Sequence, residues 1–75
     1  MPDSEGPLVE AAERYLKEHY GEDTVSMTVI QNGVNGGSGV LSVDCTVSVG
    51  GMTSDWSKMF TFRAGKVSTM SARMR

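Results

Sequence analysis

The sequence predicts an α+β fold, in which one N-terminal helix packs on a four-stranded antiparallel meander sheet. Three observations predict it. Residues 8–20 carry apolar side chains at helical spacing, residues 41–49 alternate strictly between apolar side chains and Ser, Asp or Thr, and glycine-containing turns at 50–51 and 63–65 separate further alternating runs. Because a helix and a sheet with one apolar face each must bury those faces, we expect them to cover one another.

The predicted helix begins at Pro7 and ends at Gly21. Proline fits the first helical turn, where an N–H would be unpaired in any case, and glycine fits the left-handed C-cap. Residues 1–6 are polar and lack apolar anchors, so we expect a flexible N-terminus followed by a single domain over residues 7–75. The apolar stripe of the helix consists of Leu8, Ala12, Tyr15, Leu16 and His19.

The first predicted strand spans residues 24–31. Its apolar face consists of Val25, Met27 and Val29, and Ile30 breaks the alternation. A glycine-rich connection follows at 32–38 and is long enough to be mobile. The central strand, residues 39–49, has one apolar and one polar face, so we expect it to pair with a strand on each side.

The turn after the central strand predicts how the next strand pairs. Gly50–Gly51 is a two-residue hairpin turn, because glycine tolerates positive φ at both positions. This turn pairs Val49 with Met52, and it therefore pairs Cys45 with Trp56. The inward positions of the third strand are then Trp56, Lys58, Phe60 and Phe62. Lys58 is the one misfit, and we expect it to snorkel at an edge of the sheet.

The last turn allows two registers. A two-residue loop of Ala64 and Gly65 would turn Val67, Thr69, Ser71 and Arg73 inward, which makes a poor core strand. A three-residue loop over residues 63–65, with Gly65 in the left-handed bulge position, has a different set inward, namely Met70, Ala72 and Met74. The three-residue loop is preferred, because it buries more apolar area.

No catalytic or metal-binding constellation is predicted. The chain has one Cys and one His, so an internal disulfide and a Cys/His metal site are both excluded. Cys45 faces the apolar side as a small hydrophobe, and His19 lies at the margin of the helix stripe. Asp44 and Asp55 fall on the outward faces of neighbouring strands, where solvated carboxylates are poor acid–base catalysts. We therefore predict a non-enzymatic domain without a cofactor or a metal.

Composition and charge exclude several other classes. The net charge is −2, with an acidic segment over residues 1–23 and a mildly basic one over residues 24–75. The bases are not clustered as they are in nucleic-acid-binding proteins. No apolar run approaches the ~20 residues of a membrane span, and the acidic start is unlike a signal peptide. We therefore expect a cytoplasmic protein with neither nucleic-acid nor membrane partners.

Two surfaces are candidates for contact with a protein partner. At the mouth of the glycine-rich connection, Ile30 and Val40 take outward positions and Val34 lies at the tip. These three aliphatic side chains either contact a partner or fold back over one another as a small satellite cluster. On the outer face of the sheet, Met59 and Val67 interrupt a surface rich in Ser and Thr. The leading prediction is a domain that binds a protein partner, or forms a homodimer, through its sheet.

Two short stretches resemble known families. Residues 60–67, Phe-Thr-Phe-Arg-Ala-Gly-Lys-Val, are similar to the aromatic, Gly-Lys-hydrophobic hairpin of nuclear-transport-factor-like chains. Residues 31–36, Gln-Asn-Gly-Val-Asn-Gly, are similar to the Gln-x-Val-x-Gly protease-binding loop of cystatins, with one residue inserted before the valine. Together with the order of one helix and four strands, these stretches make the chain resemble the cystatin-like fold.

Two further hypotheses remain, of which the first is implied by the resemblance. A cystatin-like inhibitor or peptide-binding module would use a loop with the candidate contacts Gln31, Val34, Asn35 and Gly36. The other hypothesis does not depend on the resemblance, because the additional N-terminal helices that form the pocket of nuclear-transport-factor-like enzymes are absent here. It is a small-ligand-binding or enzymatic domain with a pocket between helix and sheet, lined by Tyr15, His19 and Trp56. In either case Trp56 would be a binding residue only if its strand lies near an edge.

Overall fold

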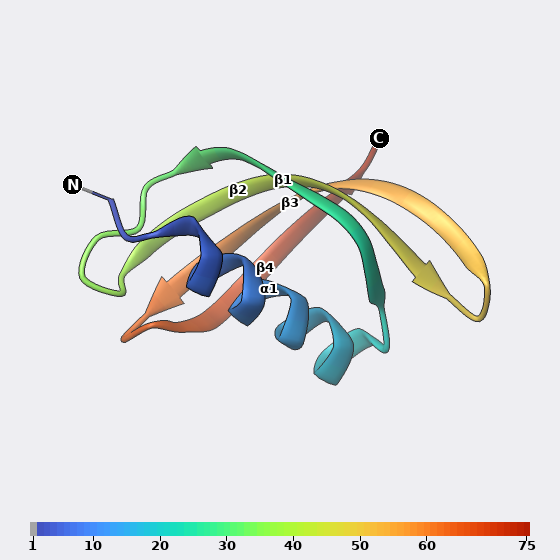
Figure 1. Cartoon of the computed structure of the whole chain (residues 1–75), viewed down its shortest axis with the longest axis horizontal. Coiled ribbons are helices and arrows are strands. Elements are labelled where there is room, and N and C mark those ends of the chain that lie inside the picture. The colour runs from blue at the N-terminus through green and yellow to red at the C-terminus, as the bar shows by residue number, and fades with distance from the viewer. Residues whose placement is uncertain (1) are drawn as a thin grey trace.

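A computed structural model describes residues 2–75 and confirms the predicted α+β arrangement. Helix α1 (Glu5–Tyr20) is followed by the strands β1 (Asp23–Asn32), β2 (Gly39–Val49), β3 (Met52–Arg63) and β4 (Lys66–Met74). The strands lie in the order β1-β2-β3-β4, each antiparallel to its neighbour. The sheet arches over α1, which lies on its concave side (Figure 1). Within residues 2–75, no helix has the length and apolar character that a membrane crossing requires.

Helix α1 begins at Glu5, two residues before the predicted start at Pro7. It ends as predicted at Gly21, whose φ of 66° is left-handed. The backbone N–H groups of Gly21 and Glu22 donate to carbonyls of the last turn, which satisfies acceptors that a helix end leaves free. The side chains that α1 buries against the sheet are Leu8, Ala12 and Leu16.

The predicted register of β2 and β3 is confirmed. Gly50 and Gly51 have φ values of 58° and 83°, and the strands they join pair Val49 with Met52. The same register places Trp56 opposite Cys45. The turn extends beyond the C-terminal end of α1 (Figure 1). The buried apolar core consists of Leu8, Ala12, Leu16, Val34, Leu41, Val43, Cys45, Val47, Phe60 and Phe62.

Strand β1 carries two bulges. Its register against β2 shifts between Thr24 and Ser26 and again between Val29 and Gln31, which leaves Val25 and Ile30 as the extra residues. The prediction that Val25 faces the core is therefore wrong, and its side chain is 60% exposed. The predicted inward positions that the structure confirms are Met27 and Val29, which pack against the core.

The turn between β3 and β4 differs from the prediction, because it contains two residues and not three. Ala64 and Gly65 have φ values of 54° and 78°, and Arg63 pairs with Lys66 across them. Positive φ at both central positions gives a turn whose twist matches that of the flanking strands.

A bulge in β4 compensates for the shorter turn. Val67 pairs with Phe62 and Thr69 pairs with Thr61, so Ser68 is an extra residue that shifts the register by one. Val67 packs against the core, and its predicted place on the outer face is therefore wrong. Beyond the bulge, the residues in line with the inward positions of β3 are the predicted Met70, Ala72 and Met74.

Candidate functional site

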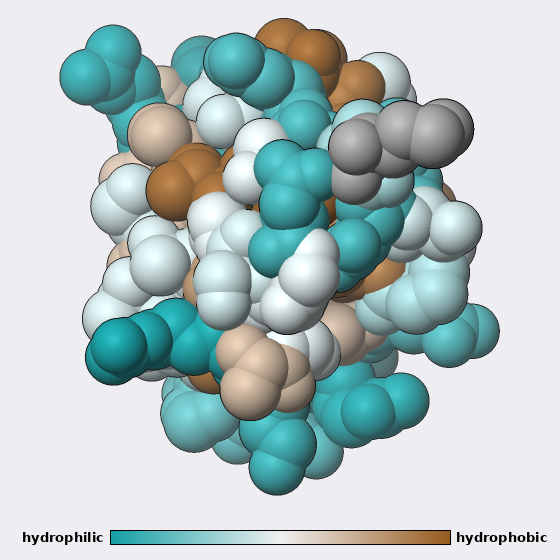
Figure 2. Space-filling view, turned by 90° about the vertical axis from the view of Figure 1, so that its left-hand side faces the viewer, coloured by the Kyte–Doolittle hydropathy of each residue, from teal (hydrophilic) through white to brown (hydrophobic). Residues whose placement is uncertain are grey.

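Three exposed apolar side chains gather on the outer face of the sheet, and we call them the outer patch. Ile30 is 60% exposed, Met59 49% and Val40 37%. Met59 of β3 pairs with Ser42 of β2, which places it diagonally beside Val40. Figure 2 views the molecule from the end where the β1–β2 loop lies, and hydrophobic side chains reach the surface there toward the convex, outer side. The predicted exposure of Ile30 and Val40 is confirmed.

Two shallow hollows meet at Met59. The first has a volume of about 500 Å³ and is lined by Ile30, Asp44 and Arg73 together with serines of β2, β3 and β4. The second, of about 450 Å³, is lined by Val40 and Gln31. Met59 lines both hollows, so its side chain stands between them. Three of the predicted contact residues, Gln31, Val40 and Met59, are thus brought together on one surface.

The two carboxylates of the outer face are bound by neighbouring side chains. Ser57 Oγ donates to Asp44 Oδ1 at 2.8 Å, and Thr46 Oγ1 donates to Asp55 Oδ1 at 2.6 Å. The guanidinium of Arg75 lies 3.8 Å from Asp44 and 4.0 Å from Asp55. Both carboxylates are accessible to water, at 35% and 60% exposure. They hold the strands together and have no surroundings suited to acid–base chemistry.

The prediction that Lys58 snorkels at an edge is wrong. Its side chain is only 2% exposed, because β3 is an internal strand and Lys58 lies on the face that α1 covers. Its Nζ lies 3.0 Å from Oε1 of Glu22, a residue that directly follows the helix cap and is 14% exposed. The rings of Trp56 and Tyr20 have centroids 5.1 and 5.9 Å from the same Nζ. This buried ion pair ties the end of α1 to the centre of the sheet.

Trp56 lies half-buried on the concave side of the sheet. Its Nε1 donates to Ser54 Oγ at 2.8 Å, and its ring lies over the Lys58 ammonium. The ring therefore helps to cover a buried charge. It does not reach the outer patch, which lies on the opposite face of the sheet.

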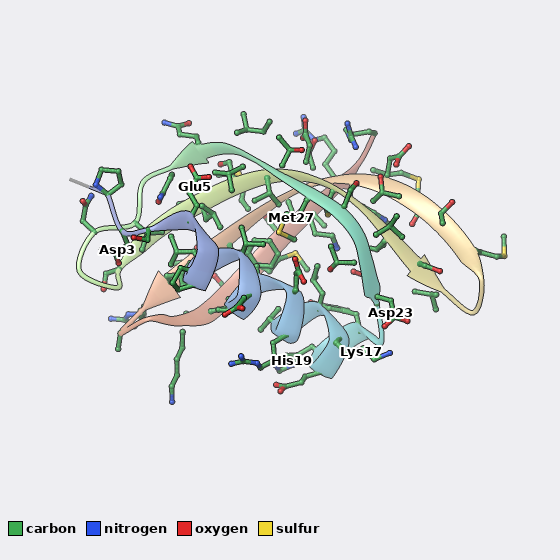
Figure 3. All side chains as sticks on the ribbon, viewed as in Figure 1. Asp3, Glu5, Lys17, His19, Asp23 and Met27 are labelled. Atoms are coloured by element: carbon green, nitrogen blue, oxygen red, sulfur yellow. The ribbon has the colours of Figure 1, made fainter. Side chains whose placement is uncertain are left out.

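The β1–β2 loop is bound by the N-terminal segment. The Asp3 carboxylate accepts hydrogen bonds from the N–H groups of Gly36, at 3.1 Å, and Gly37, at 2.7 Å. The Asp3 backbone donates to Val34 and accepts from the Asn32 side chain, both at 2.8 Å. Figure 3 shows Asp3 against this loop. Residue 3 belongs to the segment predicted to be flexible, residues 5 and 6 belong to α1, and Met1 lies outside the described residues.

Val34 neither lies exposed at the tip of this loop nor joins Ile30 and Val40 in a satellite cluster, the two predicted alternatives, but is fully buried in the main core. The neighbouring Asn35 and Gly36 are exposed, and Asn35 pairs with Ser38 through backbone hydrogen bonds of 2.9 and 3.1 Å. Of the four residues suggested by the cystatin resemblance, Asn35 and Gly36 are exposed on the loop, Gln31 is exposed near the end of β1, and Val34 is buried. This arrangement supports an inhibitory wedge less well than it supports a loop that closes one end of the core.

A groove of about 260 Å³ lies between α1 and the start of β4. Tyr15 and His19 line it, together with Arg14, Lys66 and Val67. The rings of Tyr15 and His19 stack with centroids 4.2 Å apart. Burial raises the pKa of the Tyr15 hydroxyl, and the adjacent Tyr20 raises it further. Trp56 does not line the groove, so the three residues of the predicted ligand pocket do not share this cavity.

Cys45 is 1% exposed, and burial raises the pKa of its thiol above the ordinary value of 9.0, although the nearby Lys58 ammonium lowers it. A raised pKa in the folded state contributes stability that is fully present below pH 9.0 and is lost as the pH rises through the folded value. The free energy of unfolding is measured with urea at pH 7.5 and at pH 10. Between these two pH values, we expect it to fall further for the unaltered protein than for the Cys45→Ala variant. Equal losses in the two proteins would show that the thiol titrates alike in the folded and unfolded chains.

Among residues 2–75, no group of three or more His, Cys, Asp or Glu side chains is placed to hold a metal ion. Comparison with known proteins gave no match to a family model, to a curated protein or to a solved structure. The likeness to cystatin-like and nuclear-transport-factor-like domains therefore stays a prediction from two motifs and the order of the elements. The candidate site is the outer patch with its two hollows.

Proposed function

We propose that this protein is a non-enzymatic interaction domain that self-associates through the outer face of its sheet, with the outer patch at the centre of the contact. The observation that supports this most is the exposure of Ile30, Val40 and Met59 within a face whose other side chains are polar or charged. Apolar side chains gathered on one exposed face are typical of protein–protein contacts.

The shape of the patch favours a second copy of the chain as the partner. A twofold interface uses the same surface on both copies, so that surface must be complementary to itself. Each copy offers Met59 as a protruding side chain and a hollow on either side that could receive the same methionine of the partner. Asp44 and Arg73 line the same hollow, so each copy also offers both charges that a twofold pairing would match.

The size and curvature of the outer face favour weak association. The molecule measures 37 × 21 × 19 Å, and a standard interface covers about 800 Å² on each partner, so nearly a whole face would be required. The sheet is convex on this side (Figure 1), which reduces the area that two copies can share. The proposed dimer is therefore concentration-dependent.

We place the protein in the cytoplasm, since the unpaired Cys45 thiol fits a reducing compartment.

Sedimentation equilibrium tests the proposed dimer. The average mass is expected to rise from 8.1 kDa toward twice that value as the concentration rises from about 10 μM to about 1 mM, the range of weak association. Met59→Lys is expected to weaken association by a factor of about ten or more, because it brings an unpaired charge into the centre of an apolar contact.

Met52→Lys is the matched control. Met52 is 78% exposed and lies at the Gly50–Gly51 turn, in line with the concave face, so the same change of charge there should leave association unaltered. A mass that stays at 8.1 kDa up to 1 mM, or an equal effect of the two substitutions, would rule out this interface.

A further inference from the structure

Strand β4 forms a free edge of the sheet. The backbone N–H of Arg75 donates to the carbonyl of Asp55 at 3.1 Å, which continues the ladder between β4 and β3. In an antiparallel ladder, successive residues point their backbone groups alternately toward the partner strand and away from it. Counting back from Arg75, the residues whose N–H and C=O groups point away from β3, toward the free edge, are Met70, Ala72 and Met74.

The two edges of the sheet differ in how well they could accept another strand. β1 has two bulges, and bulges disturb the regular spacing that an added strand needs. β4 pairs without any register shift from Thr69 to Met74. Of the two edges, only β4 therefore presents a regular row of free backbone groups to a strand from another molecule.

The groove between α1 and β4 adjoins this edge. It lies at the start of β4, where Tyr15 and Val67 provide apolar surface and Arg14 and Lys66 provide positive charge. Glu18 is the one acid among the lining residues. A peptide that pairs antiparallel with β4 runs toward Lys66, so its C-terminal end would reach this groove.

The charge of the edge distinguishes between possible occupants. Residues 63–75, which include the turn and all of β4, contain no acid. Their bases are Arg63, Lys66 and Arg73, together with Arg75, which already lies beside the carboxylates of Asp44 and Asp55. Two β4 strands from two copies of the chain would bring these like charges together, and lysine at a sheet edge is a known guard against such pairing. An acidic segment meets complementary charge at the same place.

We propose that the β4 edge binds an extended, acidic peptide by strand addition, with the peptide backbone pairing to Met70, Ala72 and Met74. Its acidic C-terminal side chains lie near Arg14 and Lys66 in the groove. The peptide would lie beside β4 and not over Met59, although the two surfaces adjoin, because Ala72 and Arg73 of β4 also line the first hollow of the outer patch.

A defined probe tests the proposal. The probe is an eight-residue peptide of alternating Val and Thr that ends in two glutamates with free side chains and has an amide at its C-terminus. It is titrated into the ¹⁵N-labelled protein. We expect the largest amide shifts at Met70, Ala72 and Met74, and affinity at least about tenfold above that of the same peptide ending in two lysines. Ala72→Pro is expected to lower the affinity by a similar factor, because it removes an N–H that faces the free edge and leaves the ladder to β3 intact.

Charge reversal in the groove gives the matched pair of variants. Arg14→Glu should remove the preference for the glutamate peptide, whereas Lys17→Glu, on the same helix but outside the groove, should keep it. The Met59→Lys variant should bind the peptide as well as the unaltered protein does. Amide shifts confined to the outer face, equal affinity for both peptides, or no binding at 1 mM would each overturn the proposal. So would pairing of β4 with a second copy in the absence of peptide.

Discussion

Replacing Glu22 with alanine is expected to lower the free energy of unfolding by about 3–5 kcal/mol, because it leaves the ammonium of Lys58 buried without its partner. This is a large part of the stability of a small domain, which lies toward the low end of about 5–15 kcal/mol. Urea unfolding followed by circular dichroism measures the change. The same loss would be far smaller if Lys58 reached water.

A rescue and a control sharpen this experiment. Adding Lys58→Met to Glu22→Ala should recover most of the loss, since apolar replacements for a buried ion pair are often neutral or stabilising. Asp23→Ala breaks the exposed pair of Lys17 and Asp23, in which the side chains are 60% and 67% exposed (Figure 3), and should cost no more than about 1 kcal/mol. Equal losses from Glu22→Ala and Asp23→Ala would place the Lys58 ammonium in solvent.

Much of the sheet could be predicted because its central hairpin depends on local information. A two-residue turn at Gly50–Gly51 determines every pair between β2 and β3, and the alternation of both strands then agrees with that register. The bulges could not be predicted in the same way. An extra residue such as Ser68 inverts the face of all that follows, and its position depends on how the neighbouring strand and the helix are packed.

Contacts between segments far apart in the sequence could not be predicted either. Lys58 and Glu22 are 36 positions apart, and Asp3 reaches Gly37 across 34 positions, so neither partner is visible from spacing along the chain. The sequence did contain a signal for the pair of Lys58 and Glu22. An inward lysine on an internal strand needs an acid, and Glu22 follows the helix cap. No comparable pattern indicates that Val34 is buried, because its position depends on Asp3 folding back over the loop.

For the outer patch, the alternation of inward and outward positions along the strands correctly predicted the exposure of Val40 and Met59, since both belong to the regular β2–β3 hairpin. The same alternation gave the wrong face for Val67, because this residue lies before the bulge of β4. The sequence also could not show which residues of β4 point their N–H and C=O groups toward the free edge. That depends on which residues form hydrogen bonds to β3, and the order of residue types does not specify it.

Gly39→Ala is expected to be the most damaging substitution in the β1–β2 loop, at about 3 kcal/mol or more for strain and displaced backbone together. Gly39 has a φ of 137°, and a Cβ built there would lie 2.0 Å from the carbonyl oxygen of Gly33. The obstacle is backbone and not a flexible side chain, so the loop must move as a whole. Because Gly33 directly precedes Val34, that movement should withdraw the valine from the core. Urea unfolding and the methyl shifts of Val34 would measure both effects.

Gly36→Ala separates this clash from the general cost of positive φ. Gly36 has a φ of 58° and nothing within 4 Å of a built Cβ, so alanine there should cost only about 1–2 kcal/mol for the left-handed conformation. Its N–H still donates to Asp3, so the tie between the N-terminal segment and the loop is retained. If the two alanine variants lost the same stability and left the Val34 methyl shifts unchanged, the crossing of Gly39 over Gly33 would not hold Val34 in the core. The exposed loop first predicted from the sequence would then describe the protein better.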